Sequence, residues 1–215
     1  MSLPTQIRVI TGTDTDVGKT HATAHIAARY LDAGHTVHVD KPVQTGVADG
    51  AETDVQTVRR LLGAPAALTC TEGVRLEPAM APVDAARLTD SRLPDLSWQL
   101  ARLERVVSGD VLLIEGAGGI SVEMCPGTDM ADLARDLSVP LDVVVRPGLG
   151  TQNHTLLTLE YAVRRQVRLG ALIVCRVPAE PDPVVQANLT HLRALADRFD
   201  MTWGPHVAER TPSPS

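Results

Sequence analysis

The chain has 215 residues and a net charge of −6, with 44% hydrophobic and 21% charged residues. These values are typical of a globular protein that is large enough for a sizeable core. The acidic balance, without any run of lysines and arginines, argues against a nucleic-acid-binding protein. The chain has only five aromatic residues, too few for a platform that stacks single-stranded bases.

The sequence also indicates the compartment. Its amino-terminal segment lacks the pattern of a secretory signal peptide, and no apolar run approaches the roughly 18 residues that span a membrane. The three cysteines, Cys70, Cys125 and Cys175, form no C-x-x-C pair, so we expect idle thiols in a reducing environment. We therefore expect a cytoplasmic protein that binds neither membranes nor nucleic acids.

Short apolar runs alternate with longer amphipathic stretches along the chain. The apolar runs predict strands at residues 7–11, 36–40, 111–115, 141–145 and 171–175, and a short final strand near 201–203. The amphipathic stretches predict helices at residues 18–33, 53–62, 97–107, 128–137, 151–166 and 183–199. Pro42 predicts that the second strand ends near Lys41.

Strands that are apolar on both faces and separated by helices predict an α/β fold. We expect three layers, with a mostly parallel central sheet flanked by helices. One such domain should cover residues 1–208, followed by a flexible tail rich in proline and serine at residues 209–215. Ligands of these sheets bind beyond the carboxyl ends of the strands, so the segments that follow predicted strands are the candidates for a binding site.

The first of these segments is GTDTDVGKT at residues 12–20, which ends as a phosphate-binding P-loop does. A strand precedes it and a helix follows it, as such a loop requires. Backbone N–H groups would hold phosphate oxygens, Lys19 would reach the outer phosphates, and the hydroxyl of Thr20 would bind magnesium. Five residues separate the two glycines, where the usual pattern has four.

Two further segments supply charged groups. DKPVQTG at residues 40–46 places Lys41 at a predicted strand end, from which its ammonium would point into the same cleft as Lys19. EGAGG at residues 115–119 closes an apolar strand with Glu115, a position at which carboxylates hold magnesium. The glycines of EGAGG allow a ligand to approach the backbone closely.

The fourth segment, RPGLGTQNHT at residues 146–155, leads from a strand into a helix. Free N–H groups at residues 150–153 could bind a carboxylate or a phosphate, but the spacing fits an ordinary loop equally well. Asp54 is the best further candidate for a magnesium carboxylate, although the sequence alone does not distinguish it from Glu52. The histidines show no metal-ligand spacing, and we interpret His154 as structural.

Together, the four segments resemble the dethiobiotin synthetase family. The phosphate loop of that family has the longer form G-T-x-T-x-V-G-K-T, which residues 12–20 match, so the additional residue is the family's own form. KPVQTG, EGAGG and GLGTQNHT match in the same order and at similar spacing. The resemblance implies the fold of the P-loop NTPases.

The resemblance also implies a reaction, the ATP-dependent closure of the ureido ring in biotin synthesis. One amine of 7,8-diaminopelargonate takes up carbon dioxide as a carbamate, which then attacks the γ-phosphate of ATP. The second amine attacks the carbonyl carbon of the resulting anhydride, and dethiobiotin, ADP and phosphate are released. The family further implies a homodimer with its substrate sites at the subunit interface, and magnesium as the metal.

The family pattern assigns a role to each matching residue. Lys41, Lys19 and Thr15 would be catalytic, and Thr20, Asp54 and Glu115 would hold magnesium. The nucleotide would contact Asp16, Val17, Gly18, Lys19, Thr20, His21, Asp54, Glu115, Gly116, Ala117 and Gly118. The substrate would contact Thr45, Ala81, Pro82, Gly118, Gly150, Thr151, Gln152 and Asn153, the last four from the other subunit of the dimer.

The sequence departs from the family near the predicted strand at residues 171–175. Several members have an asparagine there that contacts adenine, whereas this chain has Cys175 and Arg176, which leaves the base preference open. GPHVAE at residues 204–209 resembles the family's nucleotide segment P-x-x-A-E. The further candidate contacts to the base or ribose are therefore Cys175, Arg176, Pro205, His206, Val207 and Glu209.

Two alternatives remain at this point, a partitioning-type P-loop ATPase switch and another amide synthetase of the same superfamily. The switches usually carry an additional lysine near the start of the loop, where this chain has Gly12, Thr13 and Asp14. KPVQTG and the single-domain length count against the second alternative. A switch would hydrolyse ATP slowly without a diamine, whereas the synthetase requires one.

Overall fold

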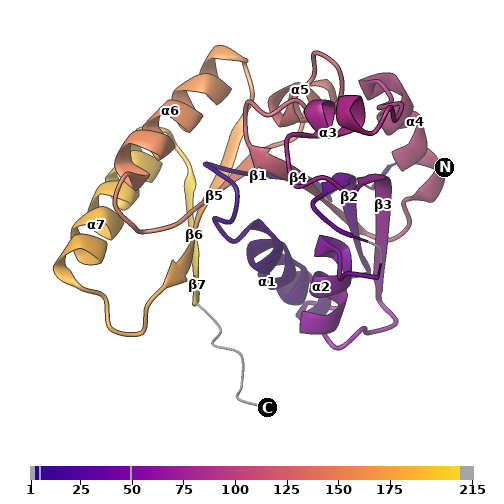
Figure 1. Ribbon diagram of the computed structural model, residues 1–215. Helices are drawn as coiled ribbons and strands as arrows, with labels where there is room; N and C mark the ends of the chain where they lie inside the picture. Colours follow the sequence, from indigo (N-terminus) through magenta and orange to yellow (C-terminus); the bar gives the residue numbers. More distant parts are fainter. Residues whose placement is uncertain (1–2, 5, 49, 209–215) are drawn as a thin grey trace.

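The computed structural model describes residues 3–4, 6–48 and 50–208, and its elements form a sheet with helices on both sides (Figure 1). The predicted tail at residues 209–215, which includes Glu209, lies outside the described residues. The strand order is β3-β2-β4-β1-β5-β6-β7, and every neighbouring pair of strands runs parallel. The predicted α/β fold with three layers is confirmed.

The strands of the sheet lie close to the apolar runs of the sequence. They are β1 (Gln6–Gly12), β2 (Val37–Thr45), β3 (Leu68–Leu76), β4 (Val111–Gly119), β5 (Leu141–Val145), β6 (Leu169–Val177) and β7 (Thr202–Ala208). The helices are α1 (Lys19–Asp32), α2 (Asp54–Leu61), α3 (Pro82–Leu88), α4 (Leu96–Val106), α5 (Met130–Asp136), α6 (Thr151–Arg164) and α7 (Pro183–Arg198). No helix of the described residues is long and apolar enough to cross a membrane.

Two elements, β3 and α3, were not predicted from the sequence. β3 lies at one edge of the sheet, and most of its residues are only half-buried, so its sequence LTCTEGVRL contains no continuous apolar run. α3 has only seven residues and begins at Pro82. Seven residues give a helical period too few repeats to stand out.

The prediction that β2 ends near Lys41 was wrong, because β2 continues through Pro42 to Thr45. β2 pairs with β4 only as far as Asp40, and beyond that point it pairs with β3 alone. Proline is tolerated in such edge-like positions because the missing N–H leaves no neighbouring strand unpaired. Gly73 of β3 makes room for the backbone of Pro42, since a Cβ there would lie 2.2 Å from the carbonyl oxygen of Pro42.

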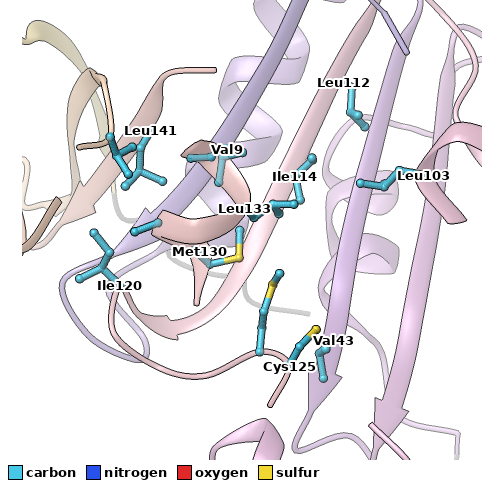
Figure 2. Packing of buried hydrophobic residues seen from close by; sticks show 14 of the residues in the cluster. Val9, Val43, Leu103, Leu112, Ile114, Ile120, Cys125, Met130, Leu133 and Leu141 are labelled. Atoms are coloured by element: carbon cyan, nitrogen blue, oxygen red, sulfur yellow. The ribbon is translucent and has the colours of Figure 1, made fainter. Parts of the chain in front are cut away.

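The side chains of the central strands alternate between two apolar layers. Ile10 and Leu113 face α1 and α2, whereas Val9 and Ile114 face the layer that contains α3, α4 and α5. Figure 2 shows this second layer, in which Met130 of α5 lies close to the central strands. α6 and α7 cover the same face over β5, β6 and β7. Because β2, β4 and β1 are parallel neighbours in the sheet, their carboxyl ends lie side by side.

Asp40 and Lys41 are neighbours on β2 and therefore point to opposite faces of the sheet. The buried carboxylate of Asp40 accepts two hydrogen bonds from the guanidinium of Arg102 on α4, at 2.8 and 2.6 Å. It accepts a third from the hydroxyl of Thr71 at 2.6 Å. This network fixes β2 from one face, and Lys41 faces the other.

We expect Arg102→Leu to lower the free energy of unfolding by about 3–5 kcal/mol, because it leaves the buried carboxylate of Asp40 without its cation. Urea denaturation measures the change. Arg105→Leu, at an exposed position of the same helix, is the control and should change stability by less than about 0.5 kcal/mol. Equal effects of the two substitutions would contradict a structural role for the Asp40–Arg102 pair.

Candidate active site

The P-loop connects β1 to α1 and packs tightly against its surroundings. Gly18 has a φ of 103°, a left-handed conformation that favours glycine. A Cβ on Gly18 would lie 2.6 Å from the Cβ of Cys175, so β6 lies directly against the loop. A Cβ on Gly12 would lie 2.7 Å from Cγ2 of Val17, which is buried in the core. Both glycines are therefore needed for the compact loop.

Lys19 is the first residue of α1, and its side chain folds back over the loop. Its Nζ donates a hydrogen bond to the carbonyl oxygen of Asp14 at 2.9 Å. Burial, reinforced by the nearby ammonium of Lys41, lowers the pKa of Lys19 to about 8. A bound polyanion would favour the charged form of this lysine. Lys19 is thus placed to balance charge on a phosphate held by the loop.

Lys41 is the centre of the site and is only 2% exposed. Its Nζ lies 3.0 Å from Oε1 of Glu115 and 2.5 Å from Oδ2 of Asp54, and it also donates to the carbonyl oxygen of Gly116 at 2.9 Å. Burial acts to lower the pKa of Lys41, but the two carboxylates outweigh it, so the pKa is raised above its ordinary value. The Lys41 side chain therefore carries its charge at neutral pH.

Asp54 opens α2 and faces the same ammonium. Burial acts to raise its pKa, but Lys41 outweighs burial and lowers it. Gln44 of β2 accepts a hydrogen bond from the backbone N–H of Asp54 at 3.1 Å, which ties the start of α2 to the strand. Glu52, the competing candidate, instead pairs with Arg60 at 2.7 Å on the surface. Asp54 thus lines the cavity beside Lys41, whereas Glu52 lies on the surface.

Glu115 meets hydroxyl groups with both of its oxygens. Oε1 accepts from Oγ1 of Thr20 at 2.9 Å, and Oε2 accepts from Oγ1 of Thr23 at 2.7 Å. The hydroxyl of Thr20 and the carboxylates of Asp54 and Glu115 are the hard oxygen ligands that magnesium prefers. No group of three or more His, Cys, Asp or Glu side chains in the described part of the chain could hold a metal ion. These ligands would therefore need the hydroxyl and the phosphates to complete the coordination.

These groups line a cavity of about 350 Å³ at the carboxyl ends of β1, β2 and β4. The predicted site residues that line it are Thr15, Asp16, Gly18, Lys19, Thr20, His21, Lys41, Thr45, Asp54, Glu115, Ala117, Gly118 and Arg176. Gln44 and Thr57 also line it and were not predicted. Gln44 lies within the KPVQTG segment, so its motif carried a usable signal, whereas Thr57 carried none.

Solved structures of similar fold have low sequence identity to this chain. The cell division protein FtsY of Thermotoga maritima gives a TM-score of 0.55 at 16% identity and covers 97% of this chain and 63% of its own. The signal recognition particle 54 kDa protein of Aeropyrum pernix, in complex with GDP, also gives 0.55 at 16% identity, over 98% of this chain and 42% of its own. At this identity the likeness shows the fold alone.

Sequence relatives decide the family. A family model described as an AAA domain matches residues 7–201. The ATP-dependent dethiobiotin synthetase of Frankia casuarinae is 44% identical over 192 residues, which cover 88% of this chain and 79% of the relative. The enzyme of Mycobacterium avium is 43% identical over 195 residues, with 88% and 83% covered. The chain belongs to the dethiobiotin synthetase family. The resemblance seen in its motifs is therefore confirmed.

Cys175 and Arg176 lie at the end of β6, where several family members have asparagine, and their surroundings differ. Arg176 lines the main cavity. Cys175 is buried, and its Sγ lies 3.5 Å from the carbonyl oxygen of Gly18. Burial raises the pKa of the Cys175 thiol to about 12. Cys175 therefore supports the P-loop from beneath, and within this chain it does not line the cavity.

The predicted base contacts on β7 lie beside the main cavity. His206 and Val207 line a second hollow of about 450 Å³ along α1, and this hollow shares His21 with the main cavity. Pro205 lines a separate hollow together with Trp203. The contacts of these family positions with a base therefore stay predictions.

The predicted substrate residues of the family fall into two groups. Thr45 lines the cavity, and the segment before Ala81 and Pro82 lies next to it, because the N–H of Gly46 donates to the carbonyl oxygen of Pro78 at 3.1 Å. Residues 150–153 form the start of α6 and do not line the main cavity of their own chain.

We expect Gly18→Ala to weaken ADP binding by at least about tenfold, because the new Cβ would displace either the P-loop or β6. Isothermal titration calorimetry with ADP measures the affinity. Gly34→Ala is the matched control, since Gly34 is also left-handed, with a φ of 85°, but a Cβ there meets nothing within 4 Å. Equal losses in the two variants would show that backbone strain alone is responsible.

Proposed function

We propose that this protein is an ATP-dependent dethiobiotin synthetase of biotin synthesis. It converts 7,8-diaminopelargonate, carbon dioxide and ATP into dethiobiotin, ADP and phosphate. The observation that carries the proposal is the pair of buried lysines, Lys19 and Lys41, which share one cavity with a P-loop of the family's form. The matches to named synthetases over 88% of the chain support it.

The P-loop binds the triphosphate through its backbone N–H groups and those of the first turn of α1. Lys19 balances charge on the outer phosphates. The hydroxyl of Thr20 and the carboxylates of Asp54 and Glu115 hold magnesium, which offsets phosphate charge when it is bound. Asp54 and Glu115 also keep the ammonium of Lys41 in place before the substrates arrive.

Lys41 acts on the phosphoryl transfer itself. One substrate amine attacks carbon dioxide and loses a proton, which gives a carbamate. A carbamate oxygen then attacks the γ-phosphorus, the bond to the β-phosphate oxygen breaks, and ADP leaves. Both reactants are anions, so the fixed ammonium of Lys41 lowers the repulsion between them in the transition state. The second amine attacks the carbonyl carbon, phosphate leaves with the bonding electron pair, and a proton is released as the ring closes.

Thr15 and Thr45 line the cavity near Lys41 and would orient the carbamate and the amines. The carboxylate at the far end of the substrate needs a separate partner. The backbone N–H groups at the start of α6, at residues 150–153, suit a carboxylate, and of these the N–H of Thr151 already donates to the carbonyl oxygen of Gly148 at 3.2 Å. They do not line the cavity of their own chain, which supports their use by the cavity of a second subunit.

A homodimer is therefore part of the proposal. α6 carries the exposed apolar side chain of Leu157, which is 58% exposed, and Leu149 lies just before the helix and is 89% exposed. Exposed apolar side chains next to a ligand-binding helix start are typical of a surface that another subunit covers. We also propose a cytoplasmic location, where its nucleotide substrate is abundant.

The activity is tested by phosphate release from nucleotide, magnesium and bicarbonate, with and without 7,8-diaminopelargonate. We expect release to depend on the diamine. ATP, CTP and GTP run in parallel report the base preference, because Cys175 and Arg176 stand in place of the family's asparagine. Release without the diamine would favour a P-loop switch, and no release from folded protein would favour another synthetase.

We expect Lys41→Ala and Lys41→Arg each to lower diamine-dependent turnover by about 100-fold or more, with ADP affinity within a few-fold of wild type. Alanine removes the charge, and arginine keeps it but cannot place a compact ammonium between Glu115 and Asp54. Steady-state kinetics and calorimetry measure the two quantities. An alanine variant with turnover near that of wild type would remove Lys41 from the mechanism.

The dimer is tested by sedimentation velocity. We expect wild-type protein to sediment as a dimer and Leu157→Glu as a monomer, because the substitution places a charge in the proposed interface. Leu88→Glu on α3, where the leucine is 67% exposed, is the control and should remain dimeric. A wild-type monomer, or dimers of unchanged stability in both variants, would contradict the proposed interface.

A further inference from the structure

Thr23 lies beneath the main cavity rather than in its lining. It belongs to α1, four residues after Lys19, and it is 0% exposed. Its Oγ1 lies 2.7 Å from Oε2 of Glu115 and 3.0 Å from the carbonyl oxygen of Lys19. Neither the motifs nor the mechanism described above gives this residue a role.

The two acceptors compete for one proton, because a hydroxyl group donates a single hydrogen bond at a time. A threonine inside a helix often bonds the carbonyl group four residues earlier, which would make Thr23 an ordinary helix residue. The carboxylate of Glu115 is charged, and its contact is the shorter one. Charge-assisted hydrogen bonds are roughly twice as strong as neutral ones, so the Thr23 hydroxyl donates its hydrogen bond to Glu115 rather than to the carbonyl oxygen of Lys19.

The two oxygens of Glu115 therefore have separate partners. Oε1 meets the hydroxyl of Thr20 and the ammonium of Lys41, whereas Oε2 meets the hydroxyl of Thr23. Among the described residues, Thr23 is the side chain that donates a hydrogen bond to Oε2. The terminal torsion of a glutamate is broad and needs such partners to hold one orientation. Because Thr23 and Lys19 share one helix, this contact ties the carboxylate to the same rigid body as the P-loop.

We propose that Thr23 is a positioning residue that fixes the carboxylate of Glu115, and with it Oε1, relative to the P-loop. The proposal deepens the proposed function and rests on it in one respect, the use of magnesium with the nucleotide. Thr23 does not line the main cavity. Its hydroxyl acts through Glu115, so its loss should weaken the part of nucleotide binding that depends on the metal and leave the rest unchanged.

The test compares Thr23→Val with Thr23→Ser. Valine keeps the shape of the buried side chain and removes the hydroxyl, whereas serine keeps the hydroxyl and removes a methyl group. Calorimetry with ADP, once with magnesium and once with a chelator, measures both affinities. We expect Thr23→Val to lower the ADP affinity by about tenfold or more when magnesium is present and to leave it unchanged with the chelator. We expect the ADP affinity of Thr23→Ser to stay within a few-fold of wild type.

A purely structural role predicts the opposite order, because lost packing would make serine the more damaging substitution. That order would overturn the proposal, as would equal losses with and without magnesium, or wild-type affinity in Thr23→Val. Should valine prevent folding, Thr23→Ala and Thr23→Ser form a second pair that differs only in the hydroxyl. The same difference in magnesium-dependent affinity is then expected between them, and its absence would overturn the proposal.

ADP binding does not require 7,8-diaminopelargonate, so the experiment separates this proposal from the proposed function. A wild-type protein that binds ADP in a magnesium-dependent way but shows no diamine-dependent turnover would refute the synthetase activity and leave the Thr23 test intact. If the ADP affinity of the wild-type protein were the same with and without magnesium, both the metal site and the role of Thr23 would be refuted.

Discussion

The ammonium of Lys41, buried between the carboxylates of Glu115 and Asp54, is the interaction on which the arrangement of the site depends. Each of the three charges comes from a different element, β2, β4 and the start of α2. Burying Lys41 or Glu115 alone would be costly, and the two buried charges are stable together with Asp54, whose side chain is 34% exposed. The sheet must therefore bring β2 and β4 together, and α2 must begin over them.

The surroundings of this ion triad are fixed from both faces of the sheet. On one face the Asp40–Arg102 pair holds β2, and Gln99 of α4 donates to the carbonyl oxygen of Pro42 at 3.1 Å. On the other face α1 contributes Thr20 and Thr23 to Glu115. Rigid elements thus carry all the charged groups, which suits a site that must stabilise developing charge without rearrangement.

Lys19 and Lys41 are the only lysines of the sequence, and all the other residues counted with them as Lys+Arg are arginines. Both lie in the cavity. Arginine serves the buried pair with Asp40 well, because its planar fork matches a carboxylate. In the site, by contrast, a compact ammonium has to fit between two carboxylates or over a tight glycine loop. The distribution of lysine is consistent with this physical requirement.

The local sequence pattern determined the fold class and several residues of the site. Strands that are apolar on both faces predicted the layered sheet, and GTDTDVGKT, KPVQTG and EGAGG indicated Lys19, Lys41 and Glu115 as groups of one site. Tertiary structure alone decided the rest. β3 could not be predicted from the sequence, because an edge strand need not be apolar. Pro42 is accommodated because β2 no longer pairs with β4 beyond Asp40. The position of Asp54 in the cavity, and the contact of Thr23 with Glu115, depend on strand order and helix placement. These are set by packing between residues far apart in the chain, which no local period records.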